Sequence, residues 1–305
     1  MSSIISQPTS EVSYNQGLFF VFSAGVLWST VGISIRLIED ASVWQILLYR
    51  SLALSTFLYF VIRFRSGENP FVQVRRSGLP AAFAGLALVA AYSGGIYSIK
   101  VIPVANALLL FATAPFMAAV LGWIVLRERV RYTTWIAILV AIGSIMIMVS
   151  GQTSNGALDG TLAALGSAFG FALFTIALRW GRSEEMLPAV FLSGVFTIVI
   201  ASIICLLMGL PFVLSAGDVS ISISMGVFQV GAGLVFYTLG SRTLPAAELT
   251  LLSLAEVLLG PFWVWLFLGE DASAYTLIGG ALLFVAIIGN ALSGMRRKIS
   301  SVNKL

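Results

Sequence analysis

The chain has 305 residues, of which 59% are hydrophobic and only 10% are charged, with a formal net charge of +4. A soluble globular domain carries about 25% charged residues, so this composition excludes a protein whose whole surface faces water. Histidine is absent and there is a single cysteine. Histidine-dependent triads, histidine-bearing zinc motifs and an intramolecular disulfide are therefore excluded.

Apolar runs of about 20 residues recur along the chain, the length that an α-helix needs to cross a hydrocarbon core of about 30 Å. The fold class that this pattern predicts is an all-α membrane protein. Ten transmembrane helices are expected, at 17–38, 42–63, 78–99, 103–126, 131–150, 157–180, 188–209, 218–240, 245–268 and 273–295.

The two ends of the chain are expected outside the membrane. Residues 1–16 form a polar tail without basic charge ahead of a full-length span, which argues against a cleavable signal peptide, and residues 296–305 form a basic tail. Fourteen of the seventeen Lys and Arg residues fall on the side that holds both termini. By the positive-inside rule this side is cytoplasmic, so we expect a multi-pass protein of the cell (inner) membrane. Topology and contact with anionic lipids explain the basic charge without a nucleic-acid partner.

The two halves of the sequence partly align when one is shifted by 142 residues. The shift pairs Pro103 with Pro245, Trp123 with Trp265, and Glu128 with Glu270. Each half, 17–150 and 157–295, holds five spans, and an odd number requires the second half to be inserted upside down. Inverted repeats are typical of secondary transporters, although a duplication that merely enlarged a helix bundle is the alternative.

The first half contains the short motifs Val-Leu-Trp-Ser-Thr at 26–30, Tyr-Arg at 49–50, Pro-Val-Ala-Asn-Ala at 103–107, Ala-Pro at 114–115 and Leu-Arg-Glu-Arg at 126–129. The second half echoes them with Pro-Ala-Ala-Glu at 245–248, Glu256 and Leu-Gly-Glu at 268–270. With these motifs the chain resembles the ten-helix EamA-type members of the drug/metabolite transporter superfamily, and within it the YddG-like amino-acid exporters. The resemblance implies outward transport and a central cavity lined by spans 1, 3, 4, 6, 8 and 9. One departure is Glu256-Val257, where a Glu-Pro pair is expected.

Two charged residues lie deep within the predicted spans, Arg50 in span 2 and Glu256 in span 9. Because such a charge costs about 2.5–3.5 kcal/mol on insertion scales, it usually faces a partner or a wet cavity. We interpret Glu256, with Ser253 one turn before it, as a contact for a substrate amine or a proton-coupling carboxylate. A structural ion pair is the alternative. Arg50 is expected to be structural, paired with Glu256 or with helix carbonyls.

Polar residues also line the two repeat-related spans 4 and 9. Asn106 and Glu248 occupy equivalent positions, Thr113 shares a helix face with Asn106, and one broad face of span 9 can hold both Glu248 and Glu256. These stripes predict substrate contacts along a solute path. Interhelical hydrogen bonds explain them equally well.

Prolines and terminal glutamates mark the same two spans. Pro115 and Pro261 each free a backbone carbonyl, so hinges are expected beside the binding site. Glu128 and Glu270 stand at the span ends and are assigned to structure. Aromatic candidates for the cavity wall, which can stack on a substrate or attract a cation, are Trp28, Tyr92, Phe169, Phe174 and Tyr237. Packing against neighbouring helices or lipid is the alternative for each.

The sequence thus predicts a secondary transporter that moves small organic metabolites, most specifically exported amino acids, by alternating access. No P-loop motif is present, so direct ATP drive is not expected. Neither enzymatic activity nor a cofactor nor a metal is expected, and a monomer is the default. Alternatives are a multidrug or cationic-compound exporter of the same fold, a non-transporting membrane subunit, and an intramembrane enzyme.

Overall fold

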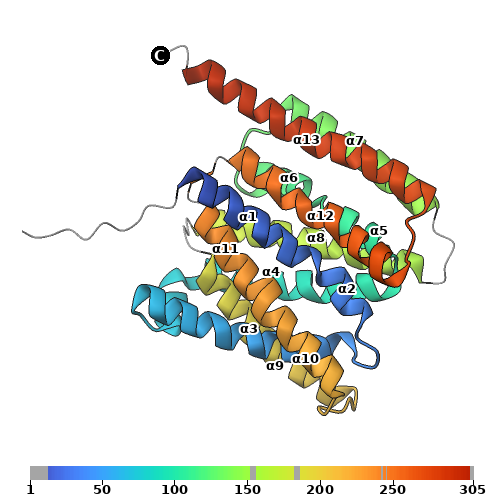
Figure 1. Cartoon of the computed structure of the whole chain (residues 1–305). Coiled ribbons are helices and arrows are strands. Elements are labelled where there is room, and N and C mark those ends of the chain that lie inside the picture. The colour runs from blue at the N-terminus through green and yellow to red at the C-terminus, as the bar shows by residue number, and fades with distance from the viewer. Residues whose placement is uncertain (1–12, 152–155, 182–185, 242, 245, 303–305) are drawn as a thin grey trace, which may run out of the picture.

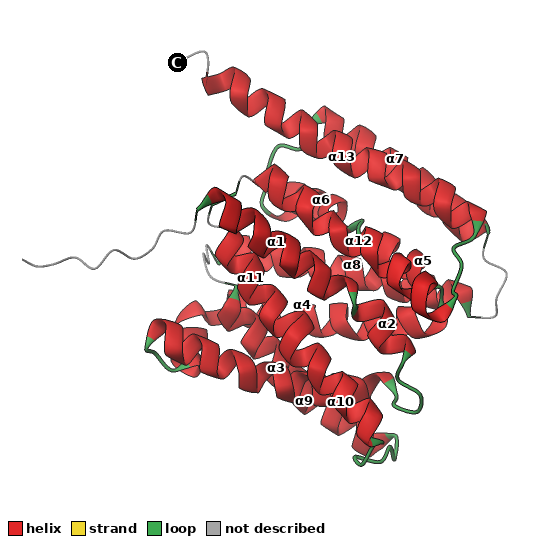
Figure 2. Cartoon of the chain, in the orientation of Figure 1, coloured by secondary structure: helices red, strands yellow, loops and turns green. Residues whose placement is uncertain are grey.

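The computed structural model describes residues 13–151, 156–181, 186–241, 243–244 and 246–302, and within these ranges every regular element is helical (Figures 1 and 2). Nine helical segments of the described chain are long and apolar enough to cross a membrane, and a shorter apolar segment, Leu254–Leu268, lies within a tenth. The prediction of an all-α membrane protein with about ten helices is therefore confirmed.

The first half contains five spans, two of them broken into shorter helices. The helices are α1 (Tyr14–Ser29), α2 (Val31–Arg36), α3 (Val43–Ser66), α4 (Pro70–Val101), α5 (Val104–Phe111), α6 (Ala114–Val125) and α7 (Tyr132–Ser150). Ser13 and Ser42 begin α1 and α3 with capping boxes that satisfy the first free amides. The third span is longer than expected, because α4 begins at Pro70 and bends at Gly78, whose φ of 63° favours glycine.

The second half repeats this order with its own irregular segment in span 8. The helices are α8 (Ala157–Trp180), α9 (Leu187–Leu207), α10 (Ala216–Ser224), the π-helical segment η1 (Met225–Ala232), α11 (Gly233–Gly240), α12 (Ala246–Leu268) and α13 (Ala274–Val302). The elements α10, η1 and α11 follow one another without a gap and together form span 8. π-Helical turns are rare and often mark functional sites.

Side-chain hydroxyls explain the break between α1 and α2. Ser29 Oγ donates to the carbonyl of Val26 at 2.7 Å, and Thr30 Oγ1 donates to the carbonyl of Leu27 at 2.7 Å. Such back-bonding competes with the helical hydrogen bonds and bends a helix. The predicted span 17–38 is consequently two helices joined at Thr30.

The packing of the helices repeats between the two halves. Helix α1 packs along α11 and α12, and its counterpart α8 packs along α4, α5 and α6, while α3 packs along α9 and α7 along α13. We call the first set, together with α2 and the residues that directly follow α12, the α1 group, and the second set, together with the residues that directly follow α6, the α8 group. In Figure 1 the α7–α13 pair lies apart at the upper edge, and α3, α9 and α10 lie at the lower edge.

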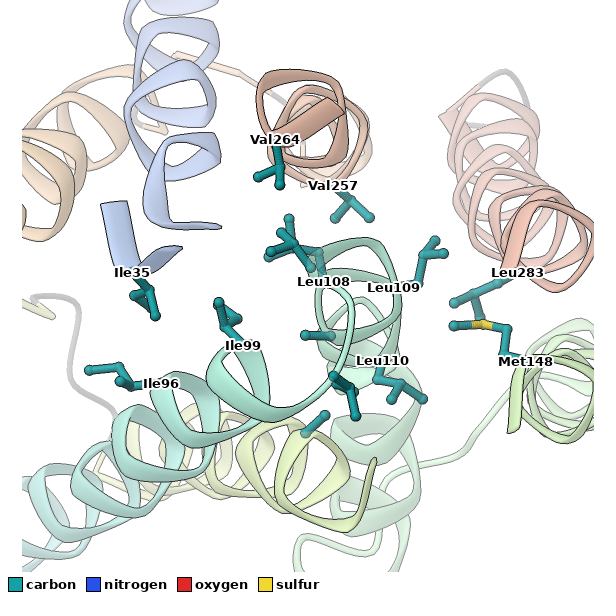
Figure 3. Close-up of a cluster of buried hydrophobic side chains, with 14 of the residues drawn as sticks. Ile35, Ile96, Ile99, Leu108, Leu109, Leu110, Met148, Val257, Val264 and Leu283 are labelled. Carbon is teal, nitrogen blue, oxygen red and sulfur yellow. The ribbon is translucent and has the colours of Figure 1, made fainter. Parts of the chain in front are cut away.

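The ends of the spans define two faces. The terminal side holds the start of α1 and the ends of α6 and α8, at the left of Figure 1, and the distal side holds the ends of α2 and α12. A core of buried apolar side chains joins the groups toward the distal side. Figure 3 shows Ile35, Ile99, Leu108, Val257 and Val264 from four spans pointing toward one another.

Candidate functional site

Glu256 lies within α12, half-buried, where α12 packs against α1. A Cβ added at Gly25 of α1 would lie 3.3 Å from the carbonyl of Leu252 and 3.8 Å from the amide nitrogen of Glu256. The two backbones therefore approach closely at this point. Among the described residues the Glu256 carboxylate has no hydrogen-bond or ion-pair partner. An unpaired carboxylate at this depth is suited to contact a cationic group.

Two aromatic rings lie along the same part of α1. The rings of Trp28 and Tyr237 have centroids 5.4 Å apart, and both side chains are half-buried. Gly233 lies against the indole of Trp28, one turn before Tyr237 on α11. Because Trp28 is one turn from Gly25, Glu256 and the two rings come from helices that pack on the same part of α1. Such rings stack on flat groups and attract cations.

A buried amide network lies beside these rings and was missed by the sequence analysis. Gln229 of η1 donates from Nε2 to Thr30 Oγ1 at 2.8 Å and to Ser34 Oγ at 2.7 Å. Its Oε1 is buried without a hydrogen-bond partner. The network ties the break in span 1 to the π-helical segment of span 8. A lone amide within the apolar run 219–240 is the signal that marks Gln229.

The expected pair between Arg50 and Glu256 does not form. The Cζ of Arg50 lies over the ring of Tyr92, 4.2 Å from its centroid, and Arg50 is 4% exposed. The physical reason is the packing: α3 lies against α9, α10 and η1, whereas α12 lies against α1. Arg50 is thus held by a cation–π contact with a residue that was expected to line the cavity.

Asn106 and Thr113 are not on an open polar stripe. Asn106 is 2% exposed and accepts a hydrogen bond of 2.5 Å from Thr276 Oγ1 of α13. Thr113 is also 2% exposed and donates to the carbonyl of Leu110 at 2.6 Å. Asn106 therefore matches the alternative of interhelical hydrogen bonding through its Oδ1, whereas the hydrogen bond of Thr113 stays within its own span.

The other polar and aromatic candidates are dispersed. Glu248 accepts a hydrogen bond of 2.9 Å from the Tyr14 hydroxyl near the terminal side. The Ser253 side chain lies outside the described part of the chain. Phe174 is buried in a core cluster, and Phe169 is 46% exposed on α8. None of them joins the group of Glu256, Trp28 and Tyr237 on the contacts described.

The two prolines act differently. Pro115 stands in the first turn of α6, directly after the break at Ala112 and Thr113 that divides span 4 into α5 and α6. Pro261 lies inside α12, which continues as one helix to Leu268. The expected interruption at Pro115 is therefore present, whereas span 9 is not interrupted at Pro261. A hinge role for either proline stays a prediction.

A hydrogen-bonded cluster joins the helix ends on the distal side. Arg36 Nε lies 2.9 Å from Glu270 Oε2, and its Nη2 donates to the carbonyl of Ile102 at 3.0 Å. Glu270 Oε1 accepts from the amide of Val104 at 2.7 Å. Arg36 and Glu270 belong to spans 1 and 9, and the turn between α4 and α5 belongs to spans 3 and 4. This cluster therefore holds four spans together.

A second ion pair lies at the opposite end of the molecule. Arg179 Nη2 lies 2.6 Å from Glu128 Oε1, close to the ends of α8 and α6. This pair holds spans 6 and 4 together on the terminal side. The assignment of Glu128 and Glu270 to structural charges agrees with these contacts. A cavity of about 290 Å³ adjoins the distal cluster, lined by α5 and by the end of α12.

The arrangement has a family signature. The model of the EamA-like transporter family matches this chain twice, at residues 15–150 and 158–292. The chain belongs to the EamA-like transporter family. The two matches also show that the chain contains two repeats of one unit, as the 142-residue shift predicts. Membership makes this chain an integral membrane transporter of a small molecule.

Relatives and solved structures extend this result. The pseudopaline exporter CntI of Pseudomonas aeruginosa is 24% identical over 85% of this chain and 91% of its own length. The uncharacterized transporter YwfM of Bacillus subtilis is 28% identical, over 58% of this chain and 60% of its own length. A solved crystal structure shares the fold over 94% of this chain and 99% of its own, with a TM-score of 0.64 and 16% identity. At that identity it shows the fold alone.

Proposed function

We propose that this chain exports amino acids and related small metabolites across the cytoplasmic membrane by alternating access, with its site at Glu256, Trp28 and Tyr237. The observation that supports it most is the unpaired Glu256 carboxylate in α12, which has no hydrogen-bond partner among the described residues. A carboxylate at this depth is costly unless it meets a cation or water. The ammonium group common to all amino acids supplies that cation.

The direction of transport and the orientation are part of this proposal. The relative CntI carries the name of an exporter, which supports outward movement. The basic residues favour the terminal side as the cytoplasmic side. A cationic-compound exporter is the second candidate, because the rings of Trp28 and Tyr237 beside Glu256 suit any organic cation, with or without a carboxylate.

Counterflow in proteoliposomes tests the proposal. Vesicles loaded with mixed amino acids receive labelled threonine, methionine, phenylalanine or lysine, and uptake is measured for the wild type, Glu256→Gln and Glu68→Gln. Saturable exchange is expected for the wild type and for Glu68→Gln, which alters an exposed carboxylate. Glu256→Gln is expected to lower the exchange about tenfold or more, the effect of losing one charge-assisted contact.

The outcomes separate the candidates. Exchange that Glu256→Gln leaves unchanged would remove Glu256 from the site. A monodisperse wild-type protein that exchanges none of the four amino acids would contradict the amino-acid assignment, and labelled organic cations would then test the second candidate. Uptake driven by a pH gradient in the wild type and lost in Glu256→Gln would add proton coupling to the role of this carboxylate.

A further inference from the structure

The two ion pairs at opposite ends of the molecule are related by the internal repeat. Glu128 and Glu270 correspond under the 142-residue shift, and Arg36 and Arg179 end the counterpart spans 1 and 6. Each pair joins the end of span 1 or 6 to the end of span 9 or 4. The same chemistry therefore occurs once on the distal side and once on the terminal side.

The distal ion pair, Arg36 with Glu270, hydrogen-bonds to the backbone of the turn between α4 and α5, which belongs to the α8 group. A Cβ added at Gly160 of α8 would lie 2.5 Å from Ile102 Cγ2, so the turn between α4 and α5 rests on α8. Arg36 and Glu270 come from the α1 group. They bind this turn from both directions, since Arg36 donates to the carbonyl of Ile102 and Glu270 accepts from the amide of Val104.

Further contacts close the same side. Lys100 Nζ, near the end of α4, donates to the carbonyl of Ala41 in the loop between α2 and α3 at 2.5 Å. The Asp218 carboxylate accepts from three consecutive amides, with the shortest bond, 2.9 Å, from Ala41. Arg36 and Glu270 thus hold the α1 and α8 groups together at the distal side by charged hydrogen bonds, which are stronger than neutral ones. Lys100 and Asp218 fix the loop between α2 and α3 to α4 and α10 on the same side.

The corresponding turn on the terminal side rests on α1. Gly17 lies against Thr243 and Leu244, which mirrors the contact of Gly160 with Ile102. The ion pair on this side, Glu128 with Arg179, belongs to the α8 group. Its side chains are 41% and 49% exposed, compared with 25% and 26% for Glu270 and Arg36. The distal ion pair, which binds the turn between α4 and α5, is thus less exposed to solvent than the terminal ion pair.

From this asymmetry we infer that the two ion pairs are alternating gates. Arg36 and Glu270 hold the distal side closed in the conformation described here. When the two groups rock and the terminal side closes, Arg179 and Glu128 bind Leu244 and the first residue of α12 in the equivalent way, and the distal contacts break. Similar chemistry at both ends keeps the two conformations close in free energy, which allows them to exchange. This inference rests on transport by alternating access in the proposed function.

Distances between spin labels on the two groups test the gates. In a Cys205→Ser background, Leu37→Cys with Leu158→Cys reports on the distal side, and Asn15→Cys with Trp180→Cys reports on the terminal side. All four positions are exposed, and each pair joins α1–α2 to α8. Glu270→Gln is expected to shift the distal distances toward longer values and the terminal distances toward shorter ones. The ratio of the two populations should change about tenfold, the effect of one charged hydrogen bond.

The counterpart variant has the opposite effect. Glu128→Gln is expected to leave the distal side closed and to remove the population with a short terminal distance. Glu68→Gln breaks an ion pair of 3.2 Å between Glu68, in the loop after α3, and Arg76 of α4, and should change neither distance. If Glu270→Gln and Glu128→Gln shift the distances in the same direction, or only lower the melting temperature, the pairs are permanent braces and the inference is wrong.

A charge swap distinguishes a gate from a simple ion pair. Arg36→Glu combined with Glu270→Arg restores opposite charges, but neither new side chain can bind the turn as before, because glutamate cannot donate to the Ile102 carbonyl. The double variant is therefore expected to be open on the distal side. Distal distances equal to those of the wild type would show that the hydrogen bonds to the turn are not needed for closure, which would contradict the inference. These measurements need no substrate. A failure of amino-acid exchange would therefore not contradict the assignment of the gates. Spin-label distances that do not change in the variants would not contradict the proposed substrate.

Discussion

At the scale of single residues, the buried arginine illustrates how a charge is retained in an apolar bundle. Arg50 is 4% exposed, its Nε has no hydrogen-bond partner, and the Tyr92 ring covers its guanidinium carbon. Removing one partner of a buried charged contact costs more than removing both, because an uncompensated charge remains. Part of the stabilisation that the Tyr92 ring provides therefore depends on Arg50.

A double-mutant cycle measures the coupling between Arg50 and Tyr92. Tyr92→Leu should lower the stability by about 2 kcal/mol more in the wild type than in the Arg50→Met background, the size of a desolvated cation–π contact. Thermal or denaturant unfolding in detergent measures the four proteins, with Tyr59→Leu as a control at another tyrosine. Equal losses in both backgrounds would mean that the two residues are not coupled.

At the scale of helices, close approach depends on individual glycines and not on the Gly-x-x-x-Gly spacing alone. A Cβ added at Gly170 of α8 would lie 2.8 Å from the carbonyl of Ala87 and 2.9 Å from the amide nitrogen of Ala91, both backbone atoms of α4. A Cβ added at Gly166, one turn earlier, would meet nothing within 4 Å. Of these two glycines, Gly170 alone is therefore required for the packing of α8 on α4.

The two positions predict opposite results for the same substitution. Gly170→Ala should destabilise the protein by about 1–3 kcal/mol, because backbone atoms cannot move aside as a flexible side chain does. Gly166→Ala should be neutral or stabilising by up to about 1 kcal/mol, since alanine favours a helix. Melting temperatures of the purified variants decide, and a loss at Gly166 equal to that at Gly170 would contradict this account of the contact.

At the scale of the whole molecule, the distribution of basic residues predicts the orientation. In the predicted topology, fourteen of the seventeen Lys and Arg residues fall on the side that holds both termini, so both ends of the chain should lie in the cytoplasm. A fluorescent protein that matures only in the cytoplasm is expected to fluoresce at either end, and alkaline phosphatase, which is active only outside, is expected to be inactive there. The reverse pattern of activities would place both termini outside the cytoplasm and would contradict the predicted orientation of the protein in the membrane.

The sequence by itself determined the features that depend on one helix or on a fixed offset. Run length and low charge predicted the spans, Pro115 marked the break in span 4, and the 142-residue shift revealed the two repeats, since each of these follows from local geometry. It also marked Glu256, because a lone charge in an apolar run is visible without a structure. The residue ranges of the two repeats and the roles of the site residues remain predictions.

Only the tertiary structure decided which helix each polar side chain meets. Helical periodicity shows which residues share a face, but it does not say which other helix lies opposite that face. Arg50 therefore contacts Tyr92 instead of Glu256. Asn106 accepts a hydrogen bond from Thr276, and Gln229 donates one to Thr30 at the break in span 1. The difference between the distal and terminal ion pairs is not visible in the sequence either, because two halves with the same sequence pattern can adopt different conformations. Only the contacts between the α1 and α8 groups show which conformation each half has.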